Sequence, residues 1–393
     1  MKRHIAYPLI ALLVSNSGWS AEAGPGVQSQ DESNQALKIC VPDTRTEFIS
    51  LLVQEARDRG YFESRRLAVE LQRVTGLGDG GGRIRSQFKL LRTERLDFGT
   101  ATRVTGPEPS CVFGNSTVDR FLASNLGMSK VRPLMVSYYG DHYDTHLVVA
   151  KNSKLKSVKE LKGKSLHIGQ LPTYMAVENL LQQNGLNFEQ VRVMSGLEGG
   201  RDRLEALESG RIAAMTAYLP SMSYLLAADK VRILEANVVS RFLLPRVPHS
   251  LLVVNAEFAA KHPETVTAFK AAVQEAYDYI LRNPSEVLVL FRRHKSPRGG
   301  EAWYNMTDAE IEKASSFIGQ VPLVEIGKNP QTDAELYCDA TKFGKAIVDK
   351  GYLQRAVDLG EWLGVPNERR NCGDSKKPGT AYMSEGESVL RNG

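Results

Sequence analysis

Cysteine and long hydrophobic runs are both scarce in this chain. Four of the 393 residues are cysteine, so the protein is not a small domain held together mainly by disulfides. After the first residues no stretch approaches the roughly 18 consecutive apolar residues that a membrane-spanning helix needs. The hydrolase signatures G-x-S-x-G and H-E-x-x-H do not occur either. The sequence therefore predicts a protein without a membrane span after its N-terminal segment, and it offers neither of these hydrolase motifs.

The four cysteines lie far apart in the sequence. Their spacing rules out a C-x-x-C redox or zinc-binding pair. Two disulfides are compatible with an oxidising compartment, and three pairings are possible. We favour a bridge between Cys338 and Cys372 and leave the pairing of Cys40 and Cys111 open. Cys40 can equally be a small apolar residue inside a buried strand.

The first residues have the pattern of a signal peptide. Met1–His4 is basic, Ile5–Val14 is apolar, and Ala21–Ala23 supplies the small residues that precede a cleavage site. We expect residues 1–23 to be removed on export, which places a soluble mature protein in a bacterial periplasm. At the other end, residues 371–393 are rich in Gly, Ser, Lys and Glu and are predicted to form a disordered tail.

The charge balance of the chain is nearly even. Lysine and arginine number 50 against 45 aspartate and glutamate residues, a formal charge of +5. We expect this small excess to be spread along the chain, where it argues weakly for attraction of anions and poorly for nucleic acid. No nucleic-acid partner is therefore predicted.

Residues 165–217 read as a second, shorter copy of residues 37–102. The clearest match sets GGRIR at 81–85 against GGRDR at 199–203. Each copy predicts the order strand, helix, strand, helix, strand, and two such units indicate two parallel-sheet lobes. The length agrees, because about 370 mature residues exceed the roughly 250 to 300 that one core serves.

The chain has to cross between the lobes twice, because the second copy lies inside the sequence of the first lobe. We assign residues 36–146 and 250–370 to lobe I and residues 147–249 to lobe II. The crossings are expected near 145–151 and 242–254, each with a strand, at His146–Ala150 and Ser250–Val254. Two strand crossings can form a hinge. The last part of lobe I is expected to contain three helices, at 263–281, 308–317 and 333–350.

Each lobe is predicted to aim the start of a helix out of the carboxyl end of a parallel strand. In lobe I the pair Thr44 and Glu47 has the form of a capping box, and in lobe II Pro172 stands where a first helical residue would. Open α/β sheets bind ligands at this edge, and the partial positive charge of a helix start suits a carboxylate, sulfonate, phosphate or polar ring atom. Thr102 and Tyr218 follow the last strand of each copy, at matching places.

Two motifs suggest other chemistry. Gly76–Gly81 matches G-x-G-x-x-G, but the dinucleotide fingerprint belongs to the first strand of a sheet and needs an acidic residue after the next strand. We read this segment as a flexible loop at the cleft. His142, Asp144 and His146 could share one face of a strand as metal ligands, yet no second cluster of His or Cys completes a site. We expect no metal and no cofactor, and we read this segment as a polar hinge entrance.

Several longer motifs together resemble a known family. They are GYFE at 60–63 followed by LAVEL at 67–71, RLDFG at 95–99, SKLKSVKELKGK at 153–164, LESGRI at 207–212 and HPETV at 262–266. This set spans most of the mature chain and is similar to the periplasmic solute-binding proteins of ABC importers for nitrate, sulfonates, taurine and thiamine precursors, the NitT/TauT family. The chain departs from the family at Arg66 and Glu94, which replace Gly, and at Ala213, which replaces Asp. These are scaffold turns.

The resemblance implies a two-lobed α/β fold of the type II periplasmic-binding-protein kind, in which each lobe is a βαβαβ sheet flanked by helices and two hinge strands join the lobes. It also implies a monomer without catalytic activity. Such a protein captures a small organic or oxyanionic solute, such as a sulfonate, a nitrate-like anion or a pyrimidine, and delivers it to ABC permease subunits in the inner membrane. Our candidates for ligand contact are Thr44, Thr102, Tyr139, Asp141, His142, Thr173, Tyr174 and Tyr218.

Two alternatives stay open. A sulfinate-cleaving hydrolase shares this fold and uses a Cys near the end of the first strand, where Cys40 falls. No histidine occurs between His4 and His142, so the base expected from lobe I is missing, and an unassisted Cys is only a few per cent thiolate at neutral pH. In the second alternative the same clamshell senses a ligand for a membrane receptor.

Overall fold

A computed structural model of the protein describes residues 37–42, 48–74, 111–119, 122, 130–139, 143–194, 197, 199–293, 307–317, 323–353 and 358–372. All of these residues belong to one compact unit, Ala36–Gly393. The predicted signal peptide, the loop Gly76–Gly81 and nearly all of the predicted C-terminal tail lie outside the described residues. Within the described residues, no helix is both long and apolar enough to cross a membrane.

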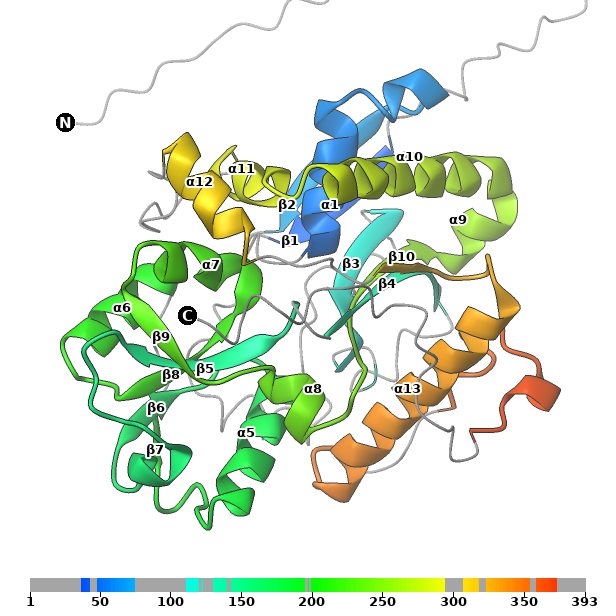
Figure 1. Ribbon diagram of the computed structural model, residues 1–393. Coiled ribbons are helices and arrows are strands. Elements are labelled where there is room, and N and C mark those ends of the chain that lie inside the picture. The colour runs from blue at the N-terminus through cyan, green and yellow to red at the C-terminus, as the bar shows by residue number, and fades with distance from the viewer. Residues whose placement is uncertain are drawn as a thin grey trace, which may run out of the picture. The chain divides into compact units, whose positions relative to one another are not determined.

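The first sheet has six strands in the order β11-β4-β10-β3-β1-β2 (Figure 1). Its first strand, β1, runs parallel to β2 and β3, and β10 runs antiparallel to β3 and β4. The bounds are β1 Leu37–Pro42, β2 Val69–Val74, β3 Phe113–Thr117, β4 Val131–Tyr139, β10 Val247–Asn255 and β11 Leu323–Glu325.

The second sheet has five strands in the order β7-β6-β8-β5-β9. Here β6 runs parallel to β7 and β8, and β5 runs antiparallel to β8 and β9. The bounds are β5 Thr145–Ala150, β6 Ser165–His167, β7 Arg192–Met194, β8 Ala214–Tyr218 and β9 Val231–Glu235.

The two sheets share one strand order, which confirms the predicted α/β class. The orders β2-β1-β3-β10-β4 and β7-β6-β8-β5-β9 correspond strand by strand. Each begins with three parallel strands, continues with one antiparallel strand and ends with one further strand. The antiparallel strands are β10 in the first sheet and β5 in the second. Along the chain, β5 comes directly after β4 of the first sheet as the next strand, and β10 is the next strand after β9 of the second sheet. The strands predicted at the two crossings are confirmed as β5 and β10. The proposed lobe boundaries stay predictions.

Helices belonging to the predicted lobe I begin with the expected signals. Pro263 occupies the first turn of α10, and Pro330 that of α13. Thr307 and Glu310 form a capping box at the start of α12. The three helices predicted for this part of the chain are therefore confirmed, with ends shifted by up to three residues. The bounds are α1 Phe48–Asp58, α9 Ala256–Lys261, α10 Pro263–Arg282, α11 Glu286–Arg293, α12 Asp308–Ser315 and α13 Pro330–Asp349.

The helices of the predicted lobe II are shorter. A left-handed glycine follows α5, where Gly185 has φ +74°, and another follows α6 at Gly210. A 3₁₀ turn, η4, precedes β6. The bounds are η4 Val158–Leu161, α5 Leu171–Gln183, α6 Gly199–Glu208, α7 Leu219–Ala227 and α8 Val238–Phe242.

Aromatic packing and a disulfide stabilise the region around the first sheet. Phe269 of α10 stacks on Phe113 of β3 and on Phe62, with ring centroids 3.9 and 5.0 Å apart. Cys338 of α13 is bonded to Cys372, which confirms the favoured pairing. That bridge ties the last described residues to α13. Cys111 is disulfide-bonded as well.

Candidate functional site

Two helices of the second sheet begin in the same way at the same edge. Helix α5 follows β6 with Gln170 as its N-cap and Leu171-Pro172 as its first residues, and α7 follows β8 with Tyr218 as its N-cap and Leu219-Pro220 next. Because β6 and β8 are parallel neighbours, both helix starts lie at the carboxyl ends of these strands. Their first N–H groups have no partner within the helix and carry partial positive charge.

The side chain of Gln170 connects this edge to the first sheet. Its Oε1 accepts a hydrogen bond from the hydroxyl of Tyr139, the last residue of β4. The Nε2 atom of His249, on β10, lies 3.0 Å from the same oxygen and donates to it when Nε2 carries the proton. Tyr139 and His249 are 1% and 3% exposed. One amide at the start of α5 thus holds two buried side chains from neighbouring strands of the other sheet.

Aromatic rings extend this group. The Tyr139 and His249 rings are 4.3 Å apart, and Tyr139 meets Tyr218 edge to face at 6.1 Å. Tyr218 in turn contacts Tyr143 at 4.7 Å, again edge to face. We call Tyr139, Tyr143, Gln170, Tyr218 and His249 the junction cluster. It combines residues from both sheets with one from the segment between β4 and β5.

The two crossings are hydrogen-bonded to each other next to this cluster. Asp144, directly before β5, accepts from the backbone N–H groups of Val239 at 3.1 Å and Ser240 at 2.9 Å, in the first turn of α8. Burial raises the pKa of Asp144, and the hydrogen bonds from Ser240, Thr145 and Val239 act in the opposite direction. The carboxylate therefore caps α8 from the outgoing crossing.

Two of the three residues that were weighed as metal ligands, Asp144 and His146, have other partners. Asp144 accepts hydrogen bonds from the first turn of α8, and Nδ1 of His146 accepts one from the backbone N–H of Asn237 at 3.3 Å. His142 lies outside the described residues. Among the residues that the structure describes, no group of three or more His, Cys, Asp or Glu side chains is placed to hold a metal ion.

The structure brings some of the predicted contact residues together. Tyr139 and Tyr218 meet in the junction cluster. Thr173, near the start of α5, has its Oγ1 3.3 Å from Oγ1 of Thr145 on β5. Tyr174 instead stacks on Phe188, with ring centroids 4.4 Å apart. The remaining candidates, Thr44, Thr102, Asp141 and His142, lie outside the described residues.

Three members of the junction cluster were not among the predicted contacts. Gln170 has a signal in the sequence, since Leu-Pro follows both Gln170 and Tyr218. Tyr143 lies inside the polar segment that was singled out as the hinge entrance. His249 has no signal of its own, because it becomes part of the site only through the pairing of β10 with β4.

Two shallow hollows also lie on the surface along α10. One, of about 410 Å³, is lined by residues that include Arg65, Pro263 and Thr267. The other, of about 500 Å³, is lined by residues that include Lys270 and Glu325. Neither contains a predicted contact residue or a member of the junction cluster, so they do not bear on the site.

Comparison with known proteins agrees with this architecture. Residues 132–287, which include β4, the second sheet and β10, match the family model described as NMT1/THI5 like. The match confirms the predicted resemblance to the solute-binding proteins of the nitrate, sulfonate, taurine and thiamine-precursor importers. A comparison with curated protein sequences finds no significant match.

Solved structures with this fold include sulfonate-binding proteins. The chain is similar to the periplasmic aliphatic sulphonate binding protein SsuA from Escherichia coli, with TM-score 0.57 and 16% identity, over 85% of this chain and 99% of that one. It is also similar to the alkanesulfonate-binding protein SsuA from Xanthomonas axonopodis pv. citri bound to MOPS, with TM-score 0.56 and 13% identity, over 83% and 97%. At these identities the likeness establishes the periplasmic-binding-protein fold, as predicted.

One similar structure belongs to the enzyme alternative. A DszB mutant in complex with biphenyl-2-sulfinic acid has TM-score 0.55 and 12% identity, over 86% of this chain and 99% of that one. The fold therefore accommodates both binding and catalysis. Only the residues of the site can distinguish the two functions.

Proposed function

We propose that this protein is the periplasmic substrate-binding component of an ABC importer, and that it holds a small organic or oxyanionic solute at the junction cluster. The observation that carries the proposal is Gln170, which binds Tyr139 and His249 of the first sheet from the start of a helix in the second. A ligand that contacts this cluster touches both sheets. It therefore has a higher affinity for the arrangement in which they are close together.

The chemistry of the cluster favours an oxyanion with an apolar remainder. Two helix starts, those of α5 and α7, direct N–H groups and partial positive charge to this edge. The faces of Tyr139, Tyr143 and Tyr218 suit an apolar or ring-shaped group. The sulfonate-binding proteins of the same fold are consistent with a sulfonate, and a nitrate-like anion or a pyrimidine is the alternative.

Delivery to a permease follows from closure. The hinge lies at the crossings, where Asp144 links the start of β5 to α8. Closing lobe I, residues 36–146 and 250–370, onto lobe II, residues 147–249, produces a form that ABC permease subunits in the inner membrane recognise. In this role the protein is exported without its first 23 residues and acts as a monomer.

The test is calorimetric titration of the purified mature protein with alkanesulfonates, taurine, nitrate and pyrimidines. One of these classes is expected to bind at 1:1. Gln170→Ala is expected to weaken that binding by about tenfold or more, because a hydrogen-bonded group next to a charged ligand is worth about 1.5 to 3 kcal/mol. Gln183→Ala, at an exposed position of the same helix, is the matched control. Equal affinities of the two variants would contradict the proposed site.

The state of the cysteines argues against the enzyme alternative. Cys111 is disulfide-bonded, and Cys338 is bonded to Cys372. Since the chain has four cysteines, we infer by count that Cys40 is the partner of Cys111, in line with the pairing of β1 and β3. A sulfur in a disulfide is not a thiolate nucleophile. Peptide mapping without reductant is expected to show this bridge, and cleavage of an aryl sulfinate by the oxidised protein would contradict the assignment.

The import role and the sensor alternative differ in the membrane protein that the ligand-loaded protein binds. Capture of ABC permease subunits by the immobilised, ligand-loaded protein supports the import role. Capture of a receptor ectodomain instead assigns the same binding site to sensing.

A further inference from the structure

One short segment carries a formal charge equal to that of the whole chain. Residues 151–164 contain six lysines and one glutamate, a formal +5, and the whole chain has a formal charge of +5. The other residues therefore balance to zero. We call the segment the lysine surface; its lysines are Lys151, Lys154, Lys156, Lys159, Lys162 and Lys164.

All six lysines are exposed on a well-fixed backbone. The apolar residues between them turn inward, since Val158 and Leu161 are 4% and 0% exposed. Arg232 of β9 donates to the carbonyl oxygens of Ser153 and Leu155, and the backbone N–H of Gly163 donates to that of Gln190 at 2.7 Å. The amino groups are therefore displayed by the folded protein.

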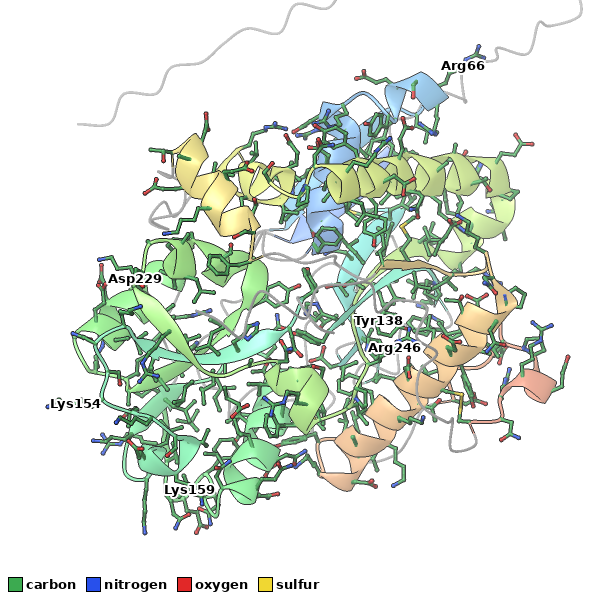
Figure 2. All side chains as sticks on the ribbon, viewed as in Figure 1. Arg66, Tyr138, Lys154, Lys159, Asp229 and Arg246 are labelled. Atoms are coloured by element: carbon green, nitrogen blue, oxygen red, sulfur yellow. A yellow bond between two sulfur atoms is a disulfide. The ribbon has the colours of Figure 1, made fainter. Side chains whose placement is uncertain are left out.

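Little negative charge neutralises this surface. Lys151 pairs with Asp229 at 2.6 Å, whereas none of the other five lysines forms an ion pair with any residue that the structure describes. Arg192, at the edge strand β7, is exposed and its backbone N–H donates to the carbonyl of Lys164 at 2.8 Å, which adds another cation beside the segment. Figure 2 shows Lys154 and Lys159 at the outside of the second-sheet region.

The lysine surface is separate from the junction cluster. Lys164 directly precedes β6, while Gln170 follows the carboxyl end of that strand. The lysines therefore lie toward the opposite edge of the second sheet from the two helix starts, and they are not placed to bind the captured solute.

The composition of the surface identifies the kind of partner. The cores of protein interfaces are enriched in aromatic residues and arginine and depleted of lysine. Here the exposed positions are mainly lysines, and the large apolar side chains between them are buried or partly buried. Clustered lysines without an apolar anchor suit a diffuse layer of negative charge, such as anionic lipid headgroups.

We propose that the lysine surface docks this protein on an anionic phospholipid membrane. Docking keeps the carrier close to the bilayer that contains its importer, but the proposal does not depend on the imported solute. Attraction of this kind is electrostatic and is weakened by salt, because the lysines lie within about one Debye length of the headgroups.

The test is co-sedimentation of the mature full-length chain with vesicles of phosphatidylcholine containing ~30% phosphatidylglycerol, and with pure phosphatidylcholine. We expect binding to the anionic vesicles at low ionic strength and weaker binding at about 0.15 M salt. Replacing Lys154, Lys156, Lys159 and Lys162 by Gln is expected to weaken binding by about 100-fold or more, since each lysine contributes about fivefold.

The matched control removes the same charge elsewhere. Lys261, Lys328, Lys342 and Lys345 are exposed lysines outside the segment, and their replacement by Gln should preserve most of the binding. Equal losses in the two variants, equal binding to both kinds of vesicle, or no binding at low salt would overturn the proposal. Binding to polyglutamate but not to anionic vesicles would also overturn it and assign the surface to an acidic protein. Solute affinity, measured in parallel, tests the proposed function separately.

Discussion

Arg246, just before β10, contacts one aromatic ring and two carboxylates. Its guanidinium lies 4.7 Å from the ring centroid of Tyr138, and the two side chains lie beside α13 (Figure 2). It also contacts Glu335 at 3.3 Å and Asp339 at 3.4 Å on that helix. Burial raises the pKa of Asp339 to about 6 and Glu335 adds to the rise, although Arg246 and Lys342 act in the opposite direction.

Asp339 should therefore give the protein a distinct pH dependence. A carboxyl whose folded pKa is about 6, against an ordinary value of 3.8, contributes stability that is present below pH ~4 and lost as the pH rises to about 6. Because a shift of one pKa unit corresponds to about 1.4 kcal/mol, the loss in the free energy of unfolding is at most about 3 kcal/mol. Asp339→Asn lacks this titration, so its stability relative to wild type should increase between pH 4 and pH 7 in urea denaturation. Asp349→Asn, an exposed position, is the control. A constant difference across this range contradicts the prediction.

His167, at the end of β6, should act in the opposite direction. Burial and, to a smaller extent, nearby Arg203 lower its pKa to about 4, while a hydrogen bond with the Met194 carbonyl opposes the shift. The folded state thus disfavours the charged imidazole, and stability falls as the pH drops from about 6.5 toward 4. His167→Gln should lose up to about 2 kcal/mol less than wild type between pH 7 and pH 5, as measured from urea midpoints. His262→Gln, at an exposed position, should follow wild type.

At the scale of elements, α8 depends on a distant carboxylate. Its five residues are too few to be stable alone, and its N-cap Asn237 makes no side-chain cap hydrogen bond. Asp144 supplies that cap across the crossings. Asp144→Ala should therefore cost about 1 to 2 kcal/mol and speed hydrogen exchange at Val239 and Ser240. Asp278→Ala, exposed on α10, should do neither. Unchanged exchange in Asp144→Ala would show that α8 is held by other contacts.

Elements with local signals were predictable. Pro263 and the pair Thr307 and Glu310 mark helix starts whose hydrogen bonds involve only neighbouring residues. Strand ends depend on residues elsewhere in the chain: β6 ends at His167, the last residue that pairs with β7.

The candidate site was predictable only in part. Tyr218 ends the last strand of the second copy, so the repeat in the sequence points to it, whereas Tyr139 lies outside both copies and was a candidate only through the family resemblance. His249 reaches Gln170 through a sheet pairing between residues far apart in the chain. The role of Gln170 is also hard to predict from the sequence. It occupies the N-cap position of α5, but its side chain hydrogen-bonds to the first sheet and does not cap its own helix.

At the scale of the whole molecule, the two sheets exchange one strand at each crossing. Each sheet contains an antiparallel strand that has just arrived from the other, so both crossings emerge beside central strands. In the proposed function, a small rotation at these crossings would leave the ladders of both sheets intact.

The repeated sequence indicated this architecture because both copies must build the same sheet. Identity of the solute is a different matter, since it depends on side chains that converge from both sheets and leave no common spacing in the sequence. The lysine surface illustrates the same limit: its charge is visible in the sequence, but its exposure and lack of partners come from the fold.

We propose that one solute binds at the junction cluster and closes the two halves of the protein around it. Small-angle scattering tests this most directly, on the mature protein with and without the member of the sulfonate, nitrate and pyrimidine panel that calorimetry shows to bind at 1:1. The radius of gyration is expected to be smaller in the saturated protein, and to change less at the same ligand concentration in Gln170→Ala. An unchanged scattering profile at verified saturation would contradict it.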